Sequence, residues 1–313
     1  MRLARPAIGV IDLGSNSIKA LVACRRDDGR LEAIEQRTID ARISAGISHA
    51  HPVLSDAGMR AGVEAVVELA DMVKAHHPLD IAVVATSAVR DAANGATFAA
   101  RVTAATGLPL RILSGDEEAQ SIGRGLLCDP ALADWQSFHV FDLGGGSLEC
   151  LSFENRRLTR AGSLPLGCVR LSERLIADPA QPLTADEESA VRAFVRDALT
   201  AAGIAFPAPL APAVFCGGTV TTSRSIVAEA RNISLAETNP RVTTELLAAI
   251  LKKLGRMPLD ERREVPGLPE RRADVMPTAL ATVLALADYA GFTAFQHSFY
   301  NLRWGIADGL LPT

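Results

Sequence analysis

Aromatic residues are scarce in this sequence. They make up 4% of its 313 residues, so aliphatic side chains must build most of the core. Long apolar runs are absent as well, and no stretch of about 18 uninterrupted apolar residues could span a membrane. The N-terminus shows neither the apolar segment nor the small-residue cleavage site of a signal peptide. We therefore expect a cytoplasmic protein with no membrane partner.

A basic surface is also missing. The formal net charge is −4, the sequence pI is about 5.9, and no block of Lys or Arg residues occurs. Because nucleic-acid-binding proteins usually carry a basic face, nucleic acid is not an expected partner. The acidic net charge does not exclude a polyanionic substrate, provided that backbone N–H groups, metal ions and a few local Arg or Lys side chains hold it.

The cysteines and histidines show no zinc pattern. Five cysteines occur far apart, none in a Cys-x-x-Cys arrangement, and several lie in aliphatic runs that are typical of buried free thiols. His297 is isolated in the sequence, and no Cys and His spacing resembles a zinc site. No Gly-x-Ser-x-Gly motif occurs either. Direct attack by water is therefore a simpler mechanism than attack by a serine nucleophile.

An internal repeat is the most informative feature that the sequence does contain. Asp12 and Asp142 each end an aliphatic strand, and each is followed by a Gly-rich polar turn and a second strand. Because no helix-start signal follows either turn, each motif is predicted to be a β-hairpin and not a P-loop or dinucleotide fingerprint. Two such hairpins, one in each half of the chain, indicate two related lobes that face each other.

The remaining segments complete an α/β pattern. We expect, in chain order, a helix over 55–75, a strand over 81–85, a polar turn over 86–91, a strand over 110–113, helices that start after Ser114 and Thr184, a strand over 214–216 that ends in a third glycine turn, and a C-terminal helix from 298. The length favours two domains. We place the first lobe at residues 1–130, joined by the C-terminal helix 298–313, and the second at residues 131–297.

The two repeated turns suggest phosphate binding. Backbone N–H groups of a Gly-rich turn can converge on a phosphate, and an Asp beside the turn can hold Mg²⁺. The alternative for each Asp is a carboxylate that only caps its turn. Glu149, which follows the second turn, is either a metal or water ligand or an exposed strand residue.

Glu118 is the candidate general base. It lies in the first turn of the helix that starts at Ser114, where a carboxylate could orient and deprotonate an attacking water. The alternative is a surface Glu favoured by the helix dipole. Glu117 fits that second role better, because it occupies the capping-box position. Arg90, after a strand end, either binds phosphate bidentately or is solvated.

The chain resembles the Ppx/GppA family of exopolyphosphatases and guanosine pentaphosphate phosphohydrolases, in its short two-domain form. That family shares its fold with sugar kinases, actin and heat-shock chaperones. The resemblance rests on motifs in the family's order at 11–17, 85–92, 112–119, 142–149, 163–171, 217–219 and 271–275. It implies two actin-like α/β lobes with a central cleft, and a homodimer.

The resemblance also implies the roles of the candidate site residues. Glu118 would activate water, and Asp142 and Glu149 would bind Mg²⁺ or Mn²⁺. The phosphate-binding residues would be Asp12, Gly14, Ser15, Asn16, Ser17, Arg90, Gly144, Gly145, Gly146, Ser147, Gly217, Gly218 and Thr219.

The expected activity is release of terminal orthophosphate from inorganic polyphosphate. The motifs do not separate this reaction from hydrolysis of guanosine pentaphosphate, because both substrates present a terminal phosphate on a polyanion. A nucleotide-binding sensor of the same fold, without turnover, is a further alternative. The presence of Glu118 argues against a pure binder. A phosphokinase would need a second-substrate pocket that the sequence does not reveal.

Overall fold

The computed structural model describes residues 5–44, 46–48, 51–206 and 211–312. These residues form two compact units, each built around one mixed β-sheet. The first unit contains the chain up to Trp135, together with residues 160–163 and the segment from Tyr300 onwards. The second unit contains residues 136–159 and 164–299. The last helix therefore belongs to the first unit, although it follows the second unit in the sequence.

The sheet of the first unit has five strands in the order β3-β2-β1-β4-β5. They are β1 (Ala7–Leu13), β2 (Ile18–Arg25), β3 (Leu31–Ile39), β4 (Asp80–Ala85) and β5 (Leu110–Ile112). The first three strands pair antiparallel, whereas β4 and β5 run parallel to β1. The pair of β1 and β2 is the expected first hairpin. The carboxyl ends of β1, β4 and β5 consequently share one edge of the sheet.

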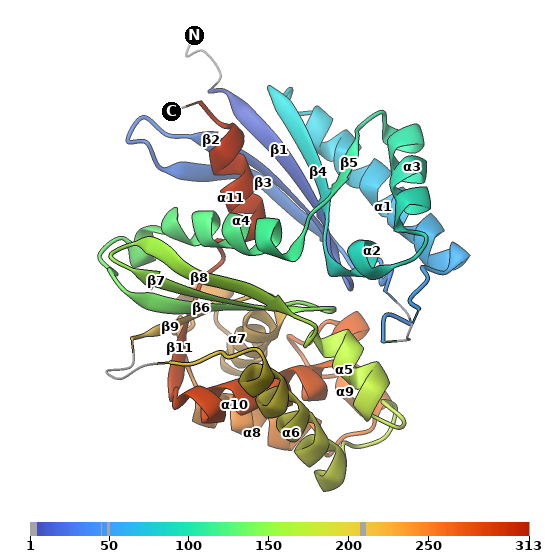
Figure 1. Ribbon diagram of the computed structural model, residues 1–313, viewed down its shortest axis with the longest axis vertical. Helices are drawn as coiled ribbons and strands as arrows, with labels where there is room; N and C mark the ends of the chain where they lie inside the picture. The colour runs from blue at the N-terminus through green and yellow to red at the C-terminus, as the bar shows by residue number, and fades with distance from the viewer. Residues whose placement is uncertain (1–4, 45, 49–50, 207–210, 313) are drawn as a thin grey trace. The chain divides into compact units, whose positions relative to one another are not determined.

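Helices cover both faces of this sheet (Figure 1). They are α1 (Asp56–Lys74), α2 (Ser87–Asp91), α3 (Gly95–Thr106), α4 (Gly115–Leu127), the 3₁₀ turn η1 (Pro130–Leu132) and α11 (Leu302–Leu310). A Cβ on Gly9 would overlap Val73 of α1, while Ile8 and Val10 form a buried cluster with Trp304 of α11. Because successive residues of a strand face opposite sides, α1 and α11 cover opposite faces.

The sheet of the second unit has six strands in the order β10-β11-β9-β6-β7-β8. They are β6 (Phe138–Leu143), β7 (Leu148–Glu154), β8 (Arg157–Leu164), β9 (Ala213–Cys216), β10 (Arg241–Thr243) and β11 (Ala294–His297). The pair of β6 and β7 is the expected second hairpin, and β9 and β11 continue parallel to β6. Apart from the added edge strand β10, this order repeats that of the first unit.

The helices of the second unit are α5 (Cys168–Leu175), α6 (Ala185–Ala201), α7 (Gly218–Arg231), α8 (Thr244–Leu254), α9 (Leu259–Arg263) and α10 (Met276–Ala290), with the 3₁₀ turns η2 (Leu235–Glu237) and η3 (Glu270–Arg272). Every residue of α10 from Met276 to Ala287 is buried. The scarce aromatic residues are concentrated here: the ring of Phe141 lies 5.6 Å from that of Phe292, and Phe215 lies 5.2 Å from Phe295.

The local helix signals are confirmed. Ser55 caps α1 by accepting the Gly58 N–H, and complete capping boxes start α4 and α6. The expected polar turn over 86–91 is wrong in one respect, since Ser87–Asp91 forms the short helix α2. The carbonyl of Thr86 accepts the N–H groups of both Val89 and Arg90, which closes one helical turn directly after β4.

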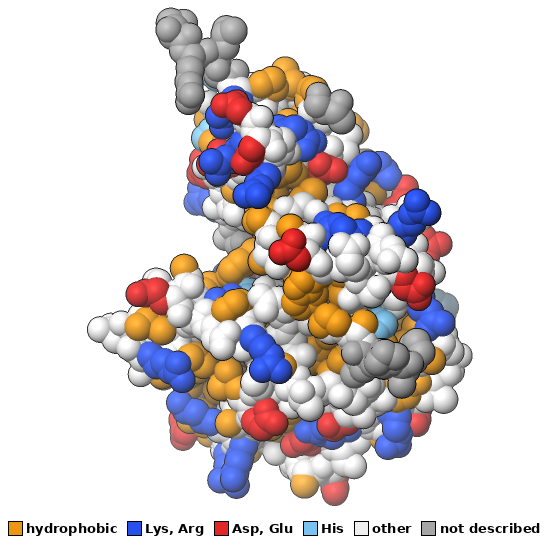
Figure 2. Space-filling view, turned by 90° about the vertical axis from the view of Figure 1, so that its left-hand side faces the viewer, with side chains coloured by type: hydrophobic (Ala, Val, Ile, Leu, Met, Phe, Trp, Pro, Cys, Tyr) orange, Lys and Arg blue, Asp and Glu red, His pale blue; other side chains and the backbone are white. Residues whose placement is uncertain are grey.

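The surface, the thiols and the helices add three observations. Lys and Arg side chains are interspersed with Asp and Glu side chains on the face seen in Figure 2. All five cysteines are free, and four of them are buried. Among the described residues, no helix has both the length and the apolar character needed to cross a bilayer.

Candidate active site

The first unit gathers its candidate residues along one sheet edge. Parallel strands bring their carboxyl ends to the same edge, which is where ligands bind in open α/β sheets. Asp12 lies at the end of β1, Thr86 follows β4, and Ser114 caps α4 after β5. The Leu113 N–H donates to the Ala85 carbonyl and the Thr86 N–H donates to the Leu13 carbonyl, so the three ends are tied together.

The turn between β1 and β2 is closed and largely buried. The Gly14 N–H donates to the Ser17 carbonyl over 3.1 Å, and Ser15, Asn16 and Ser17 are all buried. The Ser15 hydroxyl lies 3.3 Å from that of Ser87, at the start of α2. Oδ1 of Asn16 is enclosed and accepts no hydrogen bond from the described residues. An enclosed acceptor of this kind is suited to a bound donor, such as metal-bound water.

Asp12 lies within the influence of two cations. Its cross-strand partner on β2 is Lys19, and Arg303 of α11 lies within electrostatic range. Burial raises the pKa of Asp12 above its ordinary value, and the charges of Arg303 and Lys19 oppose that rise. Oδ1 of Asp12 is enclosed without a hydrogen-bond partner among the described residues. No local sequence pattern indicates that Arg303 acts on Asp12, because Arg303 comes from the far end of the chain.

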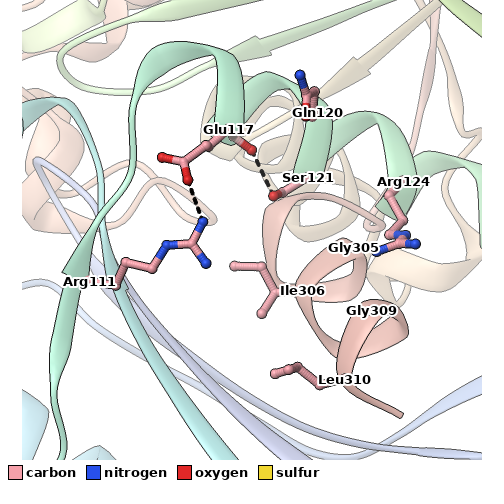
Figure 3. A pocket seen from close by; sticks show the side chains of 9 residues that line it. All are labelled: Arg111, Glu117, Gln120, Ser121, Arg124, Gly305, Ile306, Gly309 and Leu310. Carbon is pink, nitrogen blue, oxygen red and sulfur yellow. Dashed lines mark hydrogen bonds and ion pairs between the residues drawn. The ribbon is translucent and has the colours of Figure 1, made fainter. Parts of the chain in front are cut away.

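Glu117 and Glu118 are neighbours with different environments. Glu117 closes the capping box of α4 and pairs with Arg111. Both side chains line an open pocket of about 620 Å³ whose other lining residues come from α4 and α11 (Figure 3). Hydrogen bonds from the Ser114 N–H and from Arg111 lower the pKa of Glu117. The expectation that Glu117 has the capping role is therefore confirmed.

Glu118 is buried instead, with 6% of its surface exposed. Nη1 of Arg90 donates to its Oε2 over 2.8 Å and to the Leu113 carbonyl over 3.0 Å. The alternative of a solvated surface Glu is excluded by this burial. Arg90, which we expected at a phosphate, holds the carboxylate of Glu118, and its Nη2 makes no hydrogen bond to the described residues. That Nη2 group remains available to a phosphate oxygen.

The second unit pairs two carboxylates. Asp142 on β6 and Glu149 on β7 are direct cross-strand partners, so their Cβ atoms lie about 5 Å apart on one face of the sheet. Glu149 is buried, with 2% of its surface exposed, so it is not an exposed strand residue. Like charges opposite each other are destabilising unless a cation or proton is shared between them.

The turn from Gly144 to Ser147 is oriented by α5. The N–H of Cys168 donates to the Gly144 carbonyl, and those of Val169 and Arg170 both donate to the Gly145 carbonyl. Nε of Arg170 donates to the Gly146 carbonyl over 2.9 Å. Because C=O and N–H point in opposite directions across a trans peptide, the N–H groups of Gly145, Gly146 and Ser147 face away from α5.

The close contact between the start of α5 and this turn explains why a glycine, Gly167, precedes α5. A Cβ at that position would overlap the backbone of Gly145 and Gly146. The sequence contained the motif at 163–171, but its spacing did not indicate this role. Three N–H groups that point away from α5 are suited to binding an anion.

The third glycine turn starts helix α7. Gly217 has φ +89°, a left-handed conformation that glycine adopts without strain, and Gly218 and Thr219 begin the helix. A Cβ on Gly217 would lie 2.6 Å from Oδ1 of Asp142, so the Asp142 carboxylate lies directly against this turn. The N-terminus of a helix favours an anion. Asp142, Glu149 and residues 217–219 are therefore brought together within the second unit.

The carboxylate pair of the second unit fits a magnesium ion. Mg²⁺ in phosphate-processing sites is typically bound by one or two carboxylates, with substrate oxygens and waters filling the remaining positions. Asp142 and Glu149 supply that set. The corresponding positions of the first hairpin hold one carboxylate, Asp12, and one cation, Lys19. Within the described part of the chain no cluster of three or more His, Cys, Asp or Glu side chains has metal-site geometry, which such a substrate-completed site does not need.

Comparison with known proteins gives a consistent result. A model of the Ppx/GppA phosphatase family matches residues 22–313. An exopolyphosphatase from Cytophaga hutchinsonii shares 21% identity at a TM-score of 0.86, over 97% of this chain and 98% of that chain. The PPX-GPPA enzyme of Aquifex aeolicus shares 22% identity at a TM-score of 0.76, over 97% and 99%. An exopolyphosphatase-like protein shares 25% identity at a TM-score of 0.85, over 98% of each chain.

These likenesses confirm the expected fold of two actin-like α/β lobes. The family match, which covers most of the chain, also identifies the enzyme class as phosphoanhydride hydrolase. The chain belongs to the Ppx/GppA phosphatase family.

Proposed function

We propose that this protein is an exopolyphosphatase, which uses Mg²⁺ and water to release terminal orthophosphate from inorganic polyphosphate. The observation that carries the proposal is Glu118, a buried carboxylate held by Arg90 at the sheet edge where the Asp12 turn also lies. A protein that only binds its ligand has no need of such a group. The exopolyphosphatase names of two similar structures support the choice of substrate.

In the proposed reaction Glu118 is the general base. Its carboxylate accepts a proton from water, and the water oxygen attacks the terminal phosphorus. The bond from that phosphorus to the bridging oxygen breaks, and the bridging oxygen leaves with the shortened chain. Arg90 keeps the carboxylate of Glu118 oriented through Nη1, and its Nη2 contacts a phosphate oxygen. Positioned acid–base groups of this kind contribute about 10²–10⁴-fold to a rate.

The glycine turns supply the electrostatic part. The N–H groups of Gly145, Gly146 and Ser147 face away from α5 and donate to phosphate oxygens, as do those at the start of α7. Fixed backbone donors stabilise developing charge without having to reorganise during the reaction. In the first unit, phosphate oxygens are bound in the same way by the turn over Gly14, Ser15, Asn16 and Ser17. Asp142 and Glu149 would hold Mg²⁺, which when bound neutralises phosphate charge.

The test is phosphate release by the purified protein from three substrates at equal concentration: polyphosphate, guanosine pentaphosphate and ATP, each with Mg²⁺ and with EDTA. The proposal predicts magnesium-dependent release that is fastest from polyphosphate. Faster release from guanosine pentaphosphate would assign the protein to the nucleotide reaction instead. Tight binding of either polyanion, with no release in any mixture, would make it a sensor.

A further inference from the structure

A buried polar network lies behind the Gly217 turn, built from residues that the reaction as described does not use. His297 ends β11, whose last residues pair with the end of β9. Nε2 of His297 lies 3.0 Å from the Thr221 hydroxyl, and Nδ1 lies 2.7 Å from Nη1 of Arg224. The Thr221 hydroxyl donates to the Gly217 carbonyl over 3.0 Å. His297 and Arg224 are both buried, at 4% exposure each.

The network has only one possible direction of donation. A guanidinium has donors and no acceptor, so Nδ1 of His297 must accept from Arg224. The Nε2 atom of the neutral imidazole then carries the proton and donates it to the Thr221 oxygen. The hydroxyl hydrogen of Thr221 is thereby left to donate to the Gly217 carbonyl. In this series of hydrogen bonds from Arg224 through His297 and Thr221 to Gly217, every donor therefore meets an acceptor.

Arg224 anchors this series of hydrogen bonds at the end opposite to Gly217. Its Nε donates to the Thr238 hydroxyl, and its Nη2 donates to the carbonyls of Leu235 and Thr238, each over 2.9 Å. The guanidinium is therefore fixed by η2 and cannot turn away from His297. Burial, together with the Arg224 charge, lowers the pKa of His297 to about 3, which keeps the ring neutral near pH 7.

This series of hydrogen bonds ends at the carbonyl of the peptide group between Gly217 and Gly218. The N–H of Thr221 lies 3.5 Å from the Gly217 oxygen, so the hydroxyl at 3.0 Å is the closer donor to that oxygen. The peptide between Gly217 and Gly218 is planar, and its N–H points opposite to its carbonyl. Holding the carbonyl therefore aims the Gly218 N–H out of the N-terminus of α7.

We propose that His297 is a positioning residue for phosphate hydrolysis: acting through the Thr221 hydroxyl, it fixes the Gly217–Gly218 peptide so that the Gly218 N–H donates to a substrate phosphate. This inference rests on the proposed function, in which the third glycine turn contacts phosphate. It predicts that the Thr221 hydroxyl matters for substrate affinity, although it does not touch the substrate.

The test compares Thr221→Val, which removes the hydroxyl at constant shape, with Thr221→Ser, which keeps it. A matched control is Thr282→Val in α10, because that buried hydroxyl also donates to a carbonyl one helical turn earlier, over 2.8 Å to Thr278. Thr221→Val is expected to raise the KM for polyphosphate roughly tenfold, with little change in kcat, because a charge-assisted hydrogen bond is weakened in ground state and transition state alike. Thr221→Ser restores affinity, and Thr282→Val lowers the melting temperature without raising KM.

Two further readouts separate failure of this inference from failure of the proposed function. The affinity for tripolyphosphate, measured by calorimetry without turnover, should fall roughly tenfold in Thr221→Val. The ¹⁵N signals of His297 should show a neutral ring protonated at Nε2, and this signal should shift in Thr221→Val.

A wild-type protein that binds tripolyphosphate but releases no phosphate would end the hydrolase proposal and leave the positioning role supported by the affinity change. Equal KM and affinity in both Thr221 variants, no tripolyphosphate binding by wild type, or a ring protonated at Nδ1 would overturn the positioning role.

Discussion

Asp142 and Glu149 occupy paired positions on β6 and β7, whereas the same positions of the first hairpin hold Asp12 and Lys19. The two hairpins share their strand and turn pattern, so this difference in charge is the main chemical distinction between them. One hairpin carries its own counter-charge. The other places two carboxylates on paired positions, with Asp142 beside Gly217, and we propose that a divalent cation binds there.

The first prediction concerns the metal. Glu149→Gln should raise the Mg²⁺ concentration needed for half-maximal activity by at least about tenfold, because half of the protein's anionic ligand set is lost. Mg²⁺ should also raise the melting temperature of the wild-type protein more than that of the variant, since a ligand stabilises the state that binds it. Glu154→Gln, at the exposed end of the same strand, is the control. Identical Mg²⁺ titrations for all three proteins would remove Glu149 from the metal site.

The second prediction concerns Gly217. Gly217→Ala adds a Cβ that meets Oδ1 of Asp142 at 2.6 Å, in a residue with φ +89°. Gly291 at the end of α10 has a similar φ of +80°, but a Cβ there meets nothing within 4 Å. Gly291→Ala should cost about 1–2 kcal/mol in stability, because Gly291 has left-handed helical dihedral angles. Gly217→Ala should cost more, because φ +89° with ψ 176° is open essentially to glycine alone and the added Cβ would also lie 2.9 Å from the Leu143 carbonyl oxygen. Only Gly217→Ala should also abolish most phosphate release, because it displaces Asp142. Chemical unfolding and steady-state rates test the pair, and equal activity in both variants would contradict the placement of Asp142.

The third prediction follows from the neutral His297. Its pKa is lowered from 6.5 to about 3 by burial and by Arg224. Between these values the unfolded chain binds a proton that the folded protein does not, so stability is complete above about pH 6.5 and falls as the pH decreases. The slope from this group reaches about 1.4 kcal/mol per pH unit.

His297→Gln removes that component, so the stability difference between wild type and variant should shrink from pH 7 to pH 4.5. Urea unfolding at several pH values measures it. A difference that stays constant over this range would mean that His297 is protonated in the folded state.

The sequence predicted the parts of the site that depend on local chemistry. An Asp at a strand end, a Gly-rich polar turn and then aliphatic residues with no helix cap are enough to indicate a hairpin, and both hairpins are present. A Ser followed by Glu three residues later is enough to indicate a helix start, which separates Glu117 from Glu118. Contacts between residues that are far apart in the sequence could not be predicted in this way. Arg303 comes to Asp12 from the last helix, and His297 meets Thr221 across 76 positions. No local pattern encodes such contacts.

The role of α5 was also beyond the sequence. The residues at 163–171 carry no local sign of this role, yet the N–H groups of Cys168, Val169 and Arg170 donate to carbonyls of the second glycine turn. That relation depends on where the chain returns after β8. Arg90 shows the same limit: its position after β4 indicated an anion partner, and the structure supplies the Glu118 carboxylate within the protein itself.

The most direct test of the account compares Glu118→Gln with Glu117→Gln. The two residues are adjacent in α4, but one is buried against Arg90 and the other closes a capping box at the surface. Steady-state phosphate release from polyphosphate with saturating Mg²⁺ should fall about 10²–10⁴-fold in Glu118→Gln, with substrate affinity retained. Glu117→Gln should lose some stability and keep its kcat. Undiminished turnover by Glu118→Gln would contradict the account.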